Sequence, residues 1–261
     1  MRMKIYNAFG IKPTNTYVSA GSDYYVPNIK DEDKSQLALE AFVKSYGVDE
    51  QDVKYVYDMF KLVAQPYMSN NITNLVHLFF ATYNSELEEL KNCDLAKAVF
   101  YFLDEYVVYD DNKDVVGVKL AISDTLFINS GIKVALDSVL TYPEVYKGVA
   151  DTRPVEMLRS LGIGVAGLYV NKSGKGNVGF DVRACLVDED YSGYVHLSMA
   201  YTKDNIDERK AIIFCGDKLT QMMLIPVFHT QYEEVSEDEY NALMIGSQRG
   251  DNGFGSSDVK H

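Results

Sequence analysis

The stretch "VDEDYSGYVHL", residues 187 to 197, decides how this chain is interpreted. It places three acids directly after a β-branched residue and continues into a turn with Tyr191 and Gly193. Because side chains alternate along a strand, Asp188 and Asp190 are predicted to share one face while Glu189 takes the other. A carboxylate that points into a pocket can hold a water molecule as a general base. The plainer alternative is a hairpin whose acids are solvated.

Short stretches rich in β-branched and aromatic residues surround this one. Between residues 115 and 231 they are "VVGVKLAI", "TLFINSGIKVAL", "GVAGLYV", "GFDVRACLV", "GYVHLSMAY", "KAIIFC" and "QMMLIPVFHTQ". Residues 1–30 also have β character, with a turn at Gly21. Many short strands at this spacing predict a sandwich, jelly roll or β-barrel. Residues 137–162 are mixed, with one short helix expected around "RPVEMLRSL".

The pattern changes to helical between residues 31 and 110. Apolar residues recur at helical spacing in four segments: 31–47, 49–64, 71–83 and 85–109, the last with Ser85 as its expected cap and Glu88 three residues on. The fold class is therefore mainly β with an α insertion. We expect a discontinuous β body from residues 1–30 and 111–244, a helical insertion from 31–110 and a flexible arm from 245–261. Two domains in series are the alternative, and the β character of residues 1–30 argues against it.

Composition excludes several kinds of function. The 261-residue chain has a net charge of −13, which argues against nucleic-acid binding. Three scattered cysteines and four histidines without paired spacing give no metal or disulfide framework. No stretch approaches the roughly 20 apolar residues of a membrane helix, and no apolar block follows the first residues. We expect no membrane association and a cytoplasmic location, that of the host cell if the source is viral.

Five motifs in order carry a resemblance. They are "AGSDYYVP" (20–27), "VNKSGKG" (170–176), "VDEDYSG" (187–193), "CGDKLTQMMLIP" (215–226) and "RGDNGFGSS" (249–257). In this order they resemble the trimeric dUTPase family, and "INSGIKVAL" (128–136) resembles the strand before its second motif. "LRSLGIG" (158–164) competes for that second motif. Lys172 and Ser173 are favoured because they are expected to lie one short β-hairpin ahead of Asp188, as in the family, whereas Arg159 is too far upstream. On this basis the chain is identified as a divergent, phage-like member with a helical insertion.

The resemblance implies a jelly-roll homotrimer that hydrolyses dUTP to dUMP and pyrophosphate with Mg²⁺. It makes Asp188 the residue that activates water, Asp23 the metal residue acting through water, and Tyr191 the ring packed on the deoxyribose. Phe254 would stack on the base. The remaining implied ligands all donate to phosphate oxygens: Lys172, Ser173 and Gln221 near the α-phosphate, and Arg249, Ser256 and Ser257 at the distal end. Lysine at 172, where the family has arginine, and Asp258, where it has glycine, are departures that affect rate and base specificity.

Two other functions remain open from the sequence. One is a dCTP-directed enzyme of the same fold. The other is a dUTPase-like nucleotide-binding protein that serves as a regulatory module, with a protein partner at the helical insertion. Aromatic residues of the insertion would form that surface, unless they pack its own core: Tyr55, Tyr57, Phe79, Phe80 and Tyr101.

Overall fold

The computed structural model describes most of the chain in two compact units. The residues described are 3–15, 20–64, 72–83, 94–112, 115–136, 153–184, 186–203 and 211–247. The first unit is Met1–Phe228 and the second is His229–His261, and each is considered by itself.

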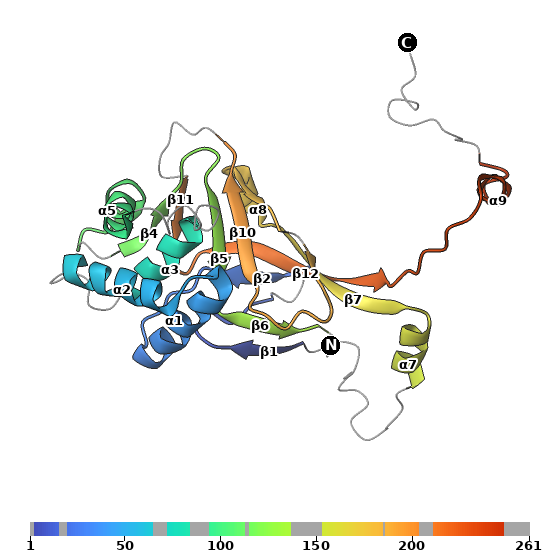
Figure 1. The fold of residues 1–261 in the computed structure, drawn as a ribbon, viewed down its shortest axis with the longest axis horizontal. Coiled ribbons are helices and arrows are strands. Elements are labelled where there is room, and N and C mark those ends of the chain that lie inside the picture. Colours follow the sequence, from blue (N-terminus) through green and yellow to red (C-terminus); the bar gives the residue numbers. More distant parts are fainter. Residues whose placement is uncertain are drawn as a thin grey trace, which may run out of the picture. The chain divides into compact units, whose positions relative to one another are not determined.

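The first unit is built on antiparallel sheets (Figure 1). The largest has the order β2-β12-β7-β9 and brings the segments of four predicted motifs into or beside one sheet. Its strands are β2 (Ser22–Tyr25), β12 (Lys218–Phe228), β7 (Ile163–Asn171) and β9 (Leu186–Val187). The other sheets are β5-β10-β8, β11-β4-β3 and β1-β6. Their strands are β5 (Thr125–Asn129), β10 (His196–Tyr201), β8 (Phe180–Val182), β11 (Ile212–Phe214), β4 (Val115–Lys119), β3 (Val107–Tyr109), β1 (Lys4–Asn7) and β6 (Ile132–Ala135). A β body with helical parts is therefore confirmed.

A sharp turn separates β5 from β6 within the predicted strand 125–136. Gly131 has φ +71°, in the left-handed region that favours glycine. A Cβ at this position would also lie 2.5 Å from the backbone nitrogen of Gly10. This glycine therefore allows the N-terminal segment to pass directly over the turn.

Helices occupy the segment that the apolar pattern predicts. They are α1 (Glu32–Tyr46), α2 (Glu50–Ala64), α3 (Ile72–Thr82) and α5 (Leu95–Glu105). Asp31 caps the start of α1, where its carboxylate accepts from the amide of Asp33 at 3.0 Å. Gly47, with φ 64°, caps its end. Helix α7 (Arg153–Ser160) confirms the short helix expected around "RPVEMLRSL".

The fourth predicted helix is partly wrong. Helix α5 is capped by Asp94 and ends at Glu105, and the next residues form β3, which pairs with β4. The β-branched pair Val107 and Val108 suits a sheet better than a helix. The predicted start at Ser85 lies outside the described residues.

Three further local predictions need correction. Asp188, Glu189 and Asp190 follow the end of β9 in a turn, so strand alternation does not order them. The short β-hairpin expected between Ser173 and Asp188 is not seen among the described residues: α8 (Ser173–Asn177) follows Lys172, β8 pairs with β10, and β9 pairs with β7. In the second unit, α9 (Glu237–Leu243) lies in a region expected to be β. Its signal was present in "SEDE", because Ser236 caps the helix by accepting from the amide of Glu239 at 3.3 Å.

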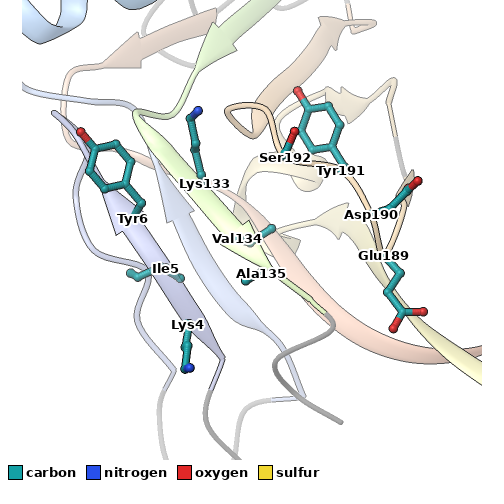
Figure 2. Close-up of a pocket in the computed structure, with 10 residues that line it drawn as sticks. All are labelled: Lys4, Ile5, Tyr6, Lys133, Val134, Ala135, Glu189, Asp190, Tyr191 and Ser192. Atoms are coloured by element: carbon teal, nitrogen blue, oxygen red, sulfur yellow. The ribbon is translucent and has the colours of Figure 1, made fainter. Parts of the chain in front are cut away.

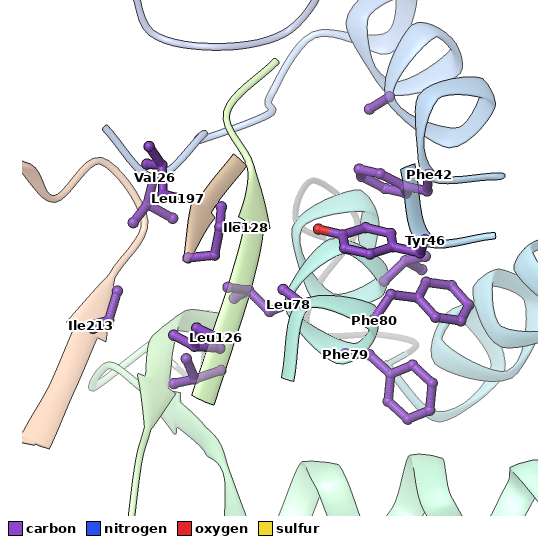
Figure 3. Close-up of a cluster of buried hydrophobic side chains, with 14 of the residues drawn as sticks. Val26, Phe42, Tyr46, Leu78, Phe79, Phe80, Leu126, Ile128, Leu197 and Ile213 are labelled. Carbon is purple, nitrogen blue, oxygen red and sulfur yellow. The ribbon is translucent and has the colours of Figure 1, made fainter. Parts of the chain in front are cut away.

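The helices and the strands share one hydrophobic core (Figure 3). Phe42 of α1 stacks on His77 of α3 at 4.8 Å between ring centroids, and Phe9 meets both rings edge-on. Tyr46 of α1 contacts Phe127 of β5 at 6.4 Å. The helical segment therefore packs directly on the β body, and its description as an insertion over residues 31–110 stays a prediction. Among the described residues, no helix has the length and apolar character needed to cross a membrane.

Two histidines, the buried His77 and the half-buried His196, make stability depend on pH. Burial lowers the pKa of His77 to about 3, and the nearby His196 acts in the same direction. Burial also lowers the pKa of His196 to about 4, against a backbone hydrogen bond to Tyr194 that raises it. Because these folded values lie below the ordinary 6.5, the unfolded chain binds more protons, and stability is lost as pH falls below about 6.5.

We therefore expect urea denaturation at pH 5 to give a free energy of unfolding lower than at pH 7.5, with about 2 kcal/mol of the loss due to His77. The variant His77→Phe removes that titration while keeping an aromatic ring, so its difference between the two pH values should be smaller by this amount. An unchanged difference in His77→Phe would contradict the assignment.

Candidate functional site

A buried carboxylate collects three side chains from distant parts of the sequence. Asp23, whose side chain is 8 % exposed, lies on β2 opposite Gln221 of β12. Its Oδ1 accepts from Lys172 Nζ and from Gln221 Nε2, both at 2.9 Å. Its Oδ2 receives Lys218 Nζ at 2.9 Å. Lys172 is 149 residues from Asp23 along the chain and Gln221 is 198 residues away, so only the fold brings them together.

These contacts keep Asp23 ionised. Burial alone would raise its pKa, but hydrogen bonds from Gln221, Lys218 and Lys172, together with the charge of Lys172, lower the pKa to about 2. One carboxylate then faces two ammonium groups, which leaves a local excess of positive charge in a chain of net charge −13. Such a local excess of positive charge attracts a small anion.

Lys172 is held in place by the residue before it. Asn171 Oδ1 accepts from the amide of Val182 at 2.7 Å, and Asn171 Nδ2 donates to Asp181 at 2.9 Å. These bonds tie the end of β7 to β8, so the chain between them leaves the sheet at Lys172. Ser173, the first residue of α8, is exposed next to it.

A third lysine belongs to the same region. Lys175 of α8 forms an ion pair with Asp217 at 2.5 Å and lies 5.8 Å from the ring centroid of Phe180. Lys175 and Lys218 were not predicted as members of this region. The signal for Lys218 was its place in the motif "CGDKLTQMMLIP", three residues before Gln221.

The acidic turn lies on a different surface, beside a groove of about 490 Å³ (Figure 2). Asp190 and Tyr191 line one wall, and Tyr6 of β1 and Lys133 of β6 line the other. Asp188 is exposed, and its carbonyl accepts from the amide of Tyr191 at 3.2 Å, which closes the turn.

Glu189, the middle acid of the turn, forms an ion pair within the protein. Its carboxylate binds Arg159 at 3.0 Å, and its side chain is 10 % exposed. This ion pair engages the arginine of "LRSLGIG", which is the rival for the second motif. The choice of Lys172 and Ser173 for that motif stays a prediction.

The pairing of the strands shows how far apart Asp23 and the acidic turn at Asp188 lie. Gln221 pairs with Asp23 on one side and with Val170 on the other, whereas Val187 pairs with Gly167. Asp188 is thus three strands across from Asp23 and about four residues along. With strands about 4.8 Å apart and about 3.3 Å per residue, the Cα atoms of Asp23 and Asp188 lie roughly 20 Å apart. Within one chain, the structure joins Asp23, Lys172 and Gln221 and leaves Asp188 and Tyr191 on the far edge.

The other predicted ligands are not located. Arg249, Phe254, Ser256 and Ser257 lie outside the described residues. Within the described ranges, no group of three or more His, Cys, Asp or Glu side chains is arranged to hold a metal ion.

The described residues thus define a strand-rich protein with a cation-lined carboxylate on one sheet and an acidic turn at its opposite edge. No family model matches the chain. It is similar to a deoxyuridine 5'-triphosphate nucleotidohydrolase of the gamma-proteobacterium EBAC31A08, with 32% identity over 99 residues, or 37% of this chain. The match spans 64% of the length of that relative. The resemblance to the dUTPase family that the motifs indicate is confirmed by this relative.

Solved structures of dUTPases are also similar in part. A mutant dUTPase of Staphylococcus bacteriophage 80alpha with dUpNHpp is 17% identical and covers 59% of this chain and 91% of its own, with a TM-score of 0.36. The native EIAV dUTPase is 17% identical and covers 52% and 93%, with a TM-score of 0.29. A mutant dUTPase from phage phi11 of S. aureus, described with a structural Mg(II) ion, is 17% identical and covers 48% and 85%, with a TM-score of 0.30.

Proposed function

We propose that this protein hydrolyses dUTP to dUMP and pyrophosphate. The single observation that carries the proposal is the convergence of Lys172 and Gln221, from two of the five motifs, on Asp23 from a third. Donors collected around one fixed carboxylate are suited to hold phosphate oxygens in a set geometry. The curated relative, a deoxyuridine triphosphate nucleotidohydrolase, supports the same reaction.

The proposed step is attack of water on the α-phosphorus. Asp188 accepts a proton from the water, a new bond forms between the water oxygen and the α-phosphorus, and the bond from that phosphorus to the bridging oxygen breaks. Pyrophosphate leaves with the electron pair of that bond. Lys172, Ser173 and Gln221 donate to oxygens on which negative charge increases during the attack.

The environment of Asp23 does not fit a directly bound Mg²⁺. Mg²⁺ requires several oxygen ligands in octahedral geometry, whereas both oxygens of Asp23 already accept from protein donors, two of them ammonium groups. A water-mediated contact through Asp23 stays a prediction. The Mg²⁺ of the proposed reaction would enter bound to phosphate oxygens of the substrate, where it would neutralise part of their charge.

The distance between the two regions supports assembly of the site from more than one chain. A base at Asp188 and a phosphate donor at Lys172 must reach the same phosphorus, and roughly 20 Å between strands of one chain is too far for that. We propose a homotrimer in which Asp188 and Tyr191 of one copy face Lys172 and Gln221 of another. Repeating one such contact around a ring closes the assembly.

Substrate selection is proposed for Tyr191 and the C-terminal arm. The Tyr191 ring would pack on the deoxyribose and leave no room for a 2'-hydroxyl. Phe254 would cover the base, and Arg249, Ser256 and Ser257 would bind the distal phosphate. A base-covering arm with several glycines can open to release product.

The regulatory-module alternative is less favoured. Phe79 and Phe80, two of the five aromatic residues proposed for a partner surface, are 0% and 1% exposed and pack in the core. Tyr55 and Tyr101 remain exposed, and Tyr57 lines a groove between α1 and α2. A partner at the helical segment therefore stays a proposal without a defined surface.

A nucleotide panel tests the reaction. With Mg²⁺ present, we expect pyrophosphate release from dUTP and little from dCTP, dTTP or UTP. Deamination of dCTP would instead identify the dCTP-directed enzyme. Binding of dUTP without turnover would favour the regulatory module. Either of these two results would overturn the proposed hydrolysis of dUTP.

A further inference from the structure

The orientation of Tyr191 is fixed by the residues that follow it. Tyr191 Oη donates to the carbonyl of Tyr194 at 2.8 Å. A Cβ added to Gly193 would lie 2.4 Å from that hydroxyl, so the ring lies directly against the Gly193 backbone. The position of Tyr191 therefore follows the position of Tyr194.

Tyr194 is connected to the helical segment through the ring of Phe9. Its ring contacts Phe9 at 5.9 Å between centroids, and Phe9 contacts Phe42 of α1 at 5.8 Å and His77 of α3 at 6.1 Å. Phe9 and Phe42 are 2% and 0% exposed. Interiors are close-packed, so a change at Phe42 is transmitted to its neighbours.

A second connection runs through hydrogen bonds. The hydroxyl of Tyr46 in α1 accepts from the amide of Asn129 at 3.1 Å, and Ser45 Oγ accepts from Asn129 Nδ2 at 2.7 Å. The next residue, Ser130, donates to the carbonyl of Val195 from its amide at 2.9 Å and from its hydroxyl at 2.7 Å. Asn129 and Ser130 are 0% and 1% exposed, so water does not replace these bonds.

Both connections begin in the last residues of α1 and end at Tyr194 and Val195. We propose that the helical segment positions Tyr191, which makes Phe42 and Tyr46 positioning residues for selection of the deoxyribose. The role in selection rests on the proposed function, whereas the mechanical connection does not. The helical segment then contributes to the specificity of the site without touching the nucleotide.

Paired variants separate positioning from general stability. Phe42→Leu and Tyr46→Phe act on the two connections. The matched control is Phe60→Leu, because Phe60 is also 0% exposed in the helical segment but contacts Phe79 and Phe102. We expect Phe42→Leu and Tyr46→Phe to raise KM for dUTP and to reduce the preference for dUTP over UTP roughly tenfold. Phe60→Leu should lower the melting temperature comparably without changing that preference.

Hydrogen exchange provides a readout that does not require turnover. The amide of Val195 donates to the carbonyl of Ile132 at 2.8 Å, so its exchange reports how firmly the turn is held. We expect faster exchange at Val195 in Phe42→Leu than in Phe60→Leu. Equal exchange in the two variants would overturn the connection itself. Faster exchange with an unchanged dUTP preference would overturn its role in selection, and absence of hydrolysis in the unmodified protein would overturn the proposed function alone.

Discussion

Replacing Asp188 with asparagine is expected to lower kcat for dUTP by roughly 10²- to 10⁴-fold, which is the usual contribution of a general base. Asparagine has nearly the same shape but cannot accept the proton of the attacking water. Because Asp188 is exposed in a turn, the variant should keep its melting temperature and its affinity for dUTP. Steady-state pyrophosphate release, calorimetric binding and thermal denaturation would measure the three quantities.

Asp190→Asn is the matched control for that experiment. Asp190 lies two residues away in the same turn, is also exposed and lines the groove beside Tyr191. The two variants change net charge equally, so a general electrostatic effect would slow both. Loss of turnover in Asp190→Asn with normal turnover in Asp188→Asn would move the base to Asp190 and contradict the assignment.

The second large effect is expected at Lys172. Lys172→Met keeps the length of the side chain and removes the charge that would face the phosphate, so kcat/KM should fall by roughly 10²- to 10³-fold. Gln221 and Lys218 still donate to Asp23 in this variant, which keeps the buried carboxylate paired and the fold intact. The control is Lys97→Met on α5, since Lys97 is 82% exposed and pairs with Asp94. An equal loss in Lys97→Met would indicate only an effect of net charge.

Mixing these two inactive variants tests how the site is assembled. If Lys172 and Asp188 act from different copies, mixed trimers of Asp188→Asn and Lys172→Met contain some sites with both original residues. Random mixing gives about a quarter of the sites restored when each site uses one residue from each of two copies. If both residues served a site within one chain, no mixture would recover activity.

Local sequence predicted the elements whose signals are local. The spacing of apolar residues located α1, α2 and α3 to within a few residues, and Gly47 marked the end of α1. The fourth helix was wrongly predicted to continue over Val107 and Val108. Their pairing with β4 is not visible in the local sequence. Helix α9 was missed although its capping signal at Ser236 and Glu239 was present in the sequence.

The sequence by itself determined which chemical groups are candidates for the site. The resemblance to the dUTPase family singled out Asp23, Lys172, Asp188 and Gln221 from short motifs along the chain. Only the tertiary structure decided which of them meet. Hydrogen bonding between β2, β12 and β7 brings Lys172 across 149 residues to Asp23, and the register of β9 keeps Asp188 at the other edge. Register depends on how two strands far apart in the chain pair with each other. The alternation of side chains within one strand therefore does not predict it.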